Sequence, residues 1–180
     1  MEPPRQVGDP QELSISRHAF KSVAAGSKAE LYAELHAQAR ALLQGERDAG
    51  ANAANLAALV FHTLPNLNWA GFYWLNGSEL VLGPFQGKPA CVRIALGKGV
   101  CGTAARDKRT VVVPDVEKFP GHIACDSASR SEIVVPVMRT ADVIGVLDLD
   151  SPSLGRFDAE DATGLEELAG LFVLATDPAP

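Results

Sequence analysis

The segment Val143–Asp150, which reads VIGVLDLD, constrains the fold more than any other stretch of this chain. In a β-strand, alternate side chains lie on the same face. The two faces of this strand are then Val143, Gly145, Leu147, Leu149 and Ile144, Val146, Asp148, Asp150. Both faces begin with apolar side chains, which predicts a strand that is covered on both sides.

The second face of this strand ends in two carboxylates, which are costly to bury side by side without compensation. Glu132 lies in the preceding predicted strand and would approach Asp148 and Asp150 if the two strands pair. Clustered carboxyl groups raise one another's pKa, so one of them could hold a proton near neutral pH. A protonated carboxyl can donate to a developing oxyanion, and an ionised one can hold an ammonium group. The alternative is a solvated strand end that turns into the segment SPSLG.

Composition narrows the classes of protein to which the chain can belong. Its 180 residues are 47% hydrophobic, which suits one globular domain with a full core. The net charge of −6 and the lack of a Lys/Arg run argue against nucleic acid or an anionic membrane as partner. No apolar run approaches the roughly 20 residues of a membrane span. The N-terminus lacks the apolar segment of a secretory signal, which predicts a cytoplasmic protein.

The periodicity of apolar residues predicts an α+β fold. Helices are expected from Ser27 to about Gly45, over 48–64 and from Asp158 onward, with a short helix after the glycine loop LGKGVCG. Strands are expected over about 68–75, 79–86, 91–95, 110–116, 131–138 and 143–150. The result is a mostly antiparallel sheet of five or six strands with helices packed on one face. Residues 1–27 are expected to be a flexible tail, and 176–180 a frayed end.

The chain has three cysteines, too few and of odd number for a disulfide framework. Cys91 lies at the start of a strand, and Cys101 lies where a helix begins, a position that stabilises a thiolate. Cys125 lies in HIACD, close to Glu132 in sequence. The alternative is that all three are small buried hydrophobic residues. A zinc site is not expected, because no CxxC occurs and the spacings of 10 and 24 residues match no usual zinc finger.

Three long segments carry a specific resemblance: GKGVCGTA, GHIACDSASRSEIVVPV and IGVLDLDSPSLGRF. Together with NWAGFYWL, they closely resemble the free methionine-(R)-sulfoxide reductases, over about residues 28–174. The resemblance implies a GAF-like catalytic domain over 28–175, with helices packed behind the sheet and a ligand pocket in front. It also implies reduction of the R epimer of free methionine sulfoxide, a homodimer, and recycling by thioredoxin without a bound cofactor.

The resemblance also implies roles for individual residues. Cys125 would be the nucleophile and Cys91 the resolving thiol, while Cys101 would have a catalytic or relay role. The implied substrate-binding residues are Trp69, Ile123, Ala124, Glu132, Asp148 and Asp150. In the implied reaction, the attacking thiol becomes a sulfenic acid, which a second thiol converts to a disulfide. The local sequence leaves open whether Cys125 or Cys101 attacks.

Two other functions are compatible with these features. A GAF domain can be a non-enzymatic sensor of a small ligand or of redox state, but the chain carries no recognisable output domain. A thiol protein that reduces peroxide would also form a disulfide, without needing Asp148. We predict the reductase.

Overall fold

The structure is a computed structural model, and it describes residues 26–123 and 126–177. Its helices are α1 (Lys28–Leu43), α2 (Ala49–Thr63), α3 (Gly99–Asp107) and α4 (Ala159–Ala175), with a 3₁₀ turn, η1, at Val116–Lys118. Its strands are β1 (Trp69–Asn76), β2 (Glu79–Gly87), β3 (Arg93–Ala95), β4 (Val111–Val113), β5 (Ser131–Arg139) and β6 (Asp142–Ser151). The predicted helices and strands are all present in this part of the chain, and the α+β class is confirmed.

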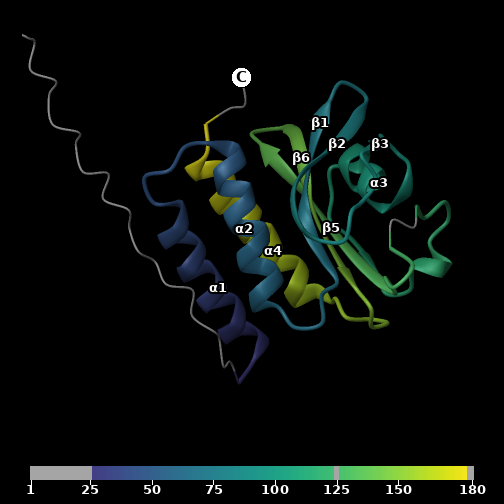
Figure 1. The fold of residues 1–180 in the computed structure, drawn as a ribbon, viewed down its shortest axis with the longest axis horizontal. Coiled ribbons are helices and arrows are strands. Elements are labelled where there is room, and N and C mark those ends of the chain that lie inside the picture. Colours follow the sequence, from purple (N-terminus) through teal and green to yellow (C-terminus); the bar gives the residue numbers. More distant parts are fainter. Residues whose placement is uncertain (1–25, 124–125, 178–180) are drawn as a thin grey trace, which may run out of the picture.

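The strands form one six-stranded sheet in the order β3-β2-β1-β6-β5-β4, with every neighbouring pair antiparallel. Helices α2 and α4 pack on one face of the sheet, and α1 lies outside them as a further layer (Figure 1). Helix α3 lies on the opposite face, against β3, β4, β5 and β6. The predicted helical layer is thus confirmed, and α3 is the helix that lies on the other side.

Each long helix begins at a residue whose side chain caps it. Ser27 accepts a hydrogen bond from the backbone N–H of Glu30, and Asp48 accepts one from that of Ala51. Asp158 forms a reciprocal capping box with Asp161 at the start of α4. Such caps satisfy backbone donors that have no partner inside the helix. The three helices therefore begin within a residue or two of the starts predicted from sequence.

Two predicted strands are shorter than expected. Strand β3 covers only Arg93–Ala95, because only three residues of β2 pair with it. Strand β4 ends at Val113, because Pro114 has no backbone N–H to continue the ladder. Asp115 then caps η1, so Val116 belongs to a 3₁₀ turn rather than to the strand.

The predicted alternation of side chains between the two faces of β6 is confirmed at the end of the strand and wrong at its start. Val146 packs on the face that carries α3, whereas Leu147 and Leu149 pack on the face of α2 and α4. At the start, Val143 packs on the α3 side and Ile144 on the helical side, the reverse of the prediction. The register of β5 with β6 shifts at this point, so a β-bulge adds a residue and reverses the alternation.

The sheet therefore separates two hydrophobic clusters. The larger one joins α1, α2 and α4 to the back of the sheet, with the Phe72 ring against Trp74 and Phe172. The smaller one lies between α3 and the front of the sheet, and includes Trp69, Tyr73 and Cys101. Strand β1 alternates accordingly, with Trp69 and Tyr73 on the front of the sheet and Phe72 and Trp74 on the back.

Candidate active site

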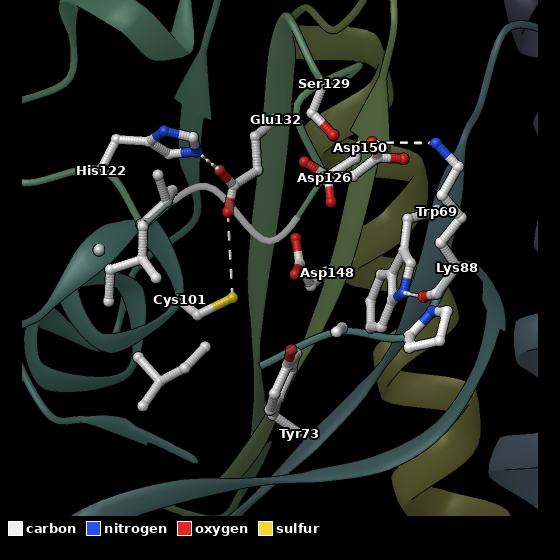
Figure 2. Close-up of a pocket in the computed structure, with 16 residues that line it drawn as sticks. Trp69, Tyr73, Lys88, Cys101, His122, Asp126, Ser129, Glu132, Asp148 and Asp150 are labelled. Carbon is white, nitrogen blue, oxygen red and sulfur yellow. Dashed lines mark hydrogen bonds and ion pairs between the residues drawn. The ribbon is translucent and has the colours of Figure 1, made fainter. Parts of the chain in front are cut away.

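A cavity lies at the front of the sheet, above the smaller cluster (Figure 2). Strands β1, β5 and β6, helix α3 and the segments before β3 and β5 all contribute side chains to its wall. The lining residues are Trp69, Tyr73, Lys88, Pro89, Ala90, Ile94, Gly99, Val100, Cys101, His122, Ile123, Asp126, Ser129, Glu132, Asp148 and Asp150.

Strand pairing brings the three predicted acids to this cavity. Glu132 of β5 lies directly opposite Asp150 of β6. Asp148 lies two residues before Asp150 in β6, so the two aspartates share one face of the strand. Strand β1 closes the arrangement, because Trp69 lies opposite Asp150 on the other side of β6. Glu132 and Asp148 are each only 6% exposed. The predicted acid cluster is therefore present at a buried wall, and the solvated strand end is excluded.

Burial raises the pKa of all three carboxyl groups, and the charges of neighbouring carboxylates raise it further. For Asp148, burial comes first and the charges of Glu132 and Asp150 follow. The pKa of Glu132 is raised in the same way, by burial and by Asp150. Burial raises the pKa of Asp150 to about 6, although a hydrogen bond with Ser129 and the nearby His122 lower it. Because the three groups interact, the cluster titrates as a unit and retains protons close to neutral pH.

The partners of these carboxyl groups are few. His122 Nε2 lies 3.5 Å from Glu132 Oε2, and Cys101 Sγ lies 4.0 Å from Glu132 Oε1. Asp148 Oδ1 is buried and has no hydrogen-bond partner. In Figure 2, Asp148 lies at the centre of the cavity, between Cys101 and Trp69. A buried carboxyl oxygen without a partner is costly, and a bound ligand that supplied a donor or a positive charge would remove that cost.

Cys101 is a free thiol in the first turn of α3, and it is buried. Its position at a helix start predicts a stabilised thiolate, and that prediction is wrong for this structure. Burial raises the pKa of Cys101 well above its usual value, and the charges of Asp148 and Glu132 raise it further. A helix N-terminus contributes only about 0.3–1 kcal/mol at exposed sites, which is too little to offset two neighbouring carboxylates in a buried site.

Cys91 is disulfide-bonded and lies just before β3. Two aromatic donors on β1 hold the segment that carries it: Tyr73 Oη donates to the Cys91 carbonyl at 3.1 Å, and Trp69 Nε1 donates to the Lys88 carbonyl at 3.1 Å. The two rings stack at a centroid distance of 5.8 Å. The same aromatic wall therefore faces the cavity and anchors the cysteine segment.

Charged side chains stand at the edge of the cavity. Lys88 Nζ lies 3.2 Å from Asp126 Oδ1, and Asn68 Nδ2 donates to Asp126 Oδ2 at 3.3 Å. The pKa of Asp126 is lowered, first by the backbone N–H of Ala128 and then by Lys88 and Asn68. Asp126 is thus an ionised, partnered carboxylate, unlike the three acids of the cavity wall.

Of the predicted site residues, Trp69, Cys101, Ile123, Glu132, Asp148 and Asp150 line the cavity. Ile123 is 38% exposed and stands at the edge. Cys91 lies beside the cavity, and Ala124 and Cys125 lie outside the described residues.

The sequence analysis did not select Tyr73, Lys88 or His122 as site residues. Tyr73 could have been found, because it shares a strand face with Trp69. Lys88 and His122 come from loops without periodicity, so nothing in the sequence placed them.

Comparisons with known proteins agree with this geometry. Residues 51–177 match the family model of the GAF domain. The free methionine-R-sulfoxide reductase of Escherichia coli is 51% identical over 152 residues, which cover 83% of this chain and 92% of the relative.

Two solved structures show the same fold. The free methionine-R-sulfoxide reductase of Neisseria meningitidis, solved in complex with its substrate, is 47% identical with a TM-score of 0.84, and the match covers 88% of this chain and 95% of that one. A protein from Burkholderia vietnamiensis named as a GAF sensor is 64% identical with a TM-score of 0.81, over 83% of this chain and 96% of that one. None of the helices in the described part of the chain has the length and apolarity to cross a membrane.

Proposed function

This chain belongs to the GAF-domain family of free methionine-R-sulfoxide reductases, and from that premise we propose that it reduces free L-methionine-(R)-sulfoxide to methionine. The observation that carries the proposal is the cluster of three buried acids, with raised pKa values, between a thiol and an aromatic wall. Reduction of a sulfoxide needs a proton for the departing oxygen, and this cluster retains protons where an ordinary carboxyl has lost them.

The cavity wall offers complementary groups to a free amino acid. An ionised carboxylate among Glu132, Asp148 and Asp150 would pair with the substrate ammonium, which a peptide-bound residue lacks. The buried ring of Trp69, which stacks against Tyr73 and Phe85, contributes apolar surface to the cavity wall where the S-methyl group would lie. Backbone N–H groups in the segment 123–125 would hold the substrate carboxylate.

In the proposed reaction, the Cys125 thiolate attacks the sulfoxide sulfur, while a protonated carboxyl of the cluster donates its proton to the sulfoxide oxygen. The sulfur–oxygen bond of the substrate breaks and the oxygen becomes bonded to the cysteine sulfur. The products are methionine, a cysteine sulfenic acid and a carboxylate, so sulfur in the substrate is reduced and the thiol is oxidised. The raised pKa of Cys101 favours Cys125 as the attacking group.

The second half of the cycle uses Cys91. Its thiol condenses with the sulfenic acid, which forms a disulfide and releases water, and thioredoxin then reduces the disulfide by exchange. Two observations support this assignment: Cys91 is disulfide-bonded, and Cys101 is a free thiol. A purely ligand-binding sensor would not need this pair.

The disulfide-bonded form leaves little space at the acids, with a cavity volume of about 30 Å³. Such a space holds one or two water-sized groups rather than an amino acid. We therefore propose that reduction of the disulfide frees the segment 88–91 and widens the cavity, and that disulfide formation helps to expel methionine. A homodimer and a cytoplasmic location, both expected from sequence, remain part of the proposal.

The proposal is tested by steady-state turnover of the full chain with free methionine-R-sulfoxide and thioredoxin. We expect turnover of this substrate, and none of the S epimer or of a peptide-bound R-sulfoxide, because neither presents the same sulfur and ammonium geometry. Cys125→Ser should abolish turnover, whereas Cys91→Ser should complete one turnover and then stop. Failure of the wild-type chain to consume the free R epimer would refute the function. Full activity in Cys125→Ser would refute the assignment of the nucleophile.

A further inference from the structure

The floor of the cavity holds three side chains that are typical metal ligands. Cys101, Glu132 and Asp148 each offer a ligand atom, these atoms lie within 4.8 Å of one another, and all three residues are buried. They come from three different elements, α3, β5 and β6. Figure 2 shows them directed toward a common point below His122. The spacing of cysteines in the sequence does not reveal such a site, because the fold combines one thiol with two carboxylates.

Two features of this floor indicate a positively charged ligand. Asp148 Oδ1 has no hydrogen-bond partner, although Asp148 is only 6% exposed and lines the cavity. Among the described lining residues, Lys88 is the one lysine or arginine, and Asp126 engages it at the outer edge. The negative charge of the floor is therefore compensated only by protons or by a cation that enters the cavity.

We propose that the reduced protein binds one thiophilic divalent cation of the Zn²⁺ class at Cys101, Glu132 and Asp148, in the space that the substrate would use. A thiolate with carboxylate oxygens suits Zn²⁺ or Co²⁺, whereas Mg²⁺ and Ca²⁺ take oxygen ligands only. His122 Nε2, which lies 3.5 Å from Glu132 Oε2, would serve as a fourth ligand if its ring moved toward the other three. Water is the alternative fourth ligand.

Binding of this cation releases protons and changes no oxidation state. The thiol of Cys101 loses its proton to solvent as the sulfur–metal bond forms, and any proton held between the two carboxyl groups is released in the same way. A cation in this site therefore removes the proton donor and occupies the space that the substrate would use. The consequence is a metal-inhibited form of the protein that a chelator restores.

The test is a titration of the reduced, metal-free, full-length chain with Co²⁺, followed by its thiolate-to-metal charge-transfer absorption and by proton release in weak buffer. We expect one equivalent, with at least one proton released, and displacement of Co²⁺ by Zn²⁺. Cys101→Ser should remove the charge-transfer band, and Asp148→Asn should weaken binding at least tenfold. Because this readout needs no turnover, failure of the metal site can be distinguished from failure of the proposed reductase activity.

The matched control is the double variant Cys91→Ser/Cys125→Ser, which removes the other two thiols and should keep the band and the affinity. His122→Ala decides between histidine and water as the fourth ligand and should weaken binding if histidine is that ligand. An unchanged band in Cys101→Ser, a band lost only in the double variant, or no Co²⁺ binding by the wild-type chain would each overturn the proposal.

Discussion

The structure contains two buried aspartates in opposite circumstances, Asp161 on the helical side of the sheet and Asp148 on the cavity side. Asp161 is 0% exposed and has partners on both oxygens. Tyr32 Oη donates to Oδ1 at 2.8 Å, Arg156 Nη1 lies 3.1 Å from Oδ1, and Lys28 Nζ and the Asp158 N–H donate to Oδ2. Asp148, in contrast, has an oxygen without a partner and two carboxyl neighbours.

This contrast separates a structural carboxylate from a candidate functional one. The partners of Asp161 tie α1 and the segment before α4 to the start of α4, so its charge contributes to the fold. The charge of Asp148 is opposed by its surroundings, so the fold tolerates it at a cost in stability. A group kept in spite of such a cost is a candidate for chemistry, and the following variants test the contrast.

The largest expected effect is on the activity of Asp148→Asn. An amide cannot supply the acidic proton, so kcat/KM for free methionine-R-sulfoxide should fall by about 10²–10⁴-fold. The free energy of unfolding should stay the same or increase, because a buried acid that repels two carboxyl neighbours is replaced by a neutral group. Steady-state kinetics and urea denaturation measure the two quantities. Loss of stability together with activity would assign Asp148 a structural role.

The reverse pattern is expected for Asp161→Asn. Removal of this charge leaves Lys28 and Arg156 without their buried partner, which should lower the free energy of unfolding by about 3–5 kcal/mol. Activity per folded molecule should be preserved at low temperature. Asp158→Asn is the matched control, since Asp158 is exposed and caps the same helix. Asparagine caps a helix about as well as aspartate, and an exposed ion pair is worth about 0–1 kcal/mol, so this variant should cost less than about 1 kcal/mol. Equal losses in the two variants would contradict the comparison.

A smaller effect is expected in the pH dependence of stability. The folded pKa of Asp150 is raised from 3.8 to about 6, so the folded state binds more protons between these values. Stability contributed by this group is then fully present below the lower value and is lost as pH rises through the upper one, by about 3 kcal/mol in total. Denaturant unfolding across this window should show a flatter profile for Asp150→Asn than for the wild type. Parallel profiles would mean that the folded pKa is not raised.

The smallest effect is expected for Tyr73→Phe, which removes the hydrogen bond to the Cys91 carbonyl. Loss of one such bond costs about 1 kcal/mol, so disulfide formation after a single turnover should slow roughly three- to tenfold. Tyr32→Phe removes a hydroxyl from the Asp161 network instead and should leave that rate unchanged. Rapid-quench thiol counting measures both variants. If both slow equally, the anchoring role of Tyr73 is wrong.

The sequence predicted the fold well where local signals were strong. Capping residues at Ser27 and Asp158 and the apolar periodicity over 48–64 were sufficient to place the long helices, and the alternation of the strand ends placed the acid cluster. The bulge that exchanges Val143 and Ile144 was not predictable, because it arises from the pairing of β5 with β6. Alternation in a single strand carries no information about register with its neighbour.

The site was predicted less completely than the fold. Glu132, Asp148 and Asp150 followed from strand periodicity and pairing, whereas Lys88 and His122 reach the cavity from loops. The state of Cys101 was predicted wrongly, because sequence shows the helix start but not the two carboxyl groups that face it. Electrostatics of a buried site depends on residues that only tertiary structure brings together.

If the cavity acids hold a proton at neutral pH, infrared difference spectroscopy should detect the C=O stretch of a protonated carboxyl group. The wild-type chain at pH 7 should show a protonated-carboxyl band that shifts in ²H₂O and titrates away at higher pH. The band should be lost or reduced in Asp148→Asn and Asp150→Asn, and retained in Asp161→Asn. A wild-type spectrum with ionised carboxylates only, or a band lost with Asp161 rather than with the cavity acids, would contradict the account.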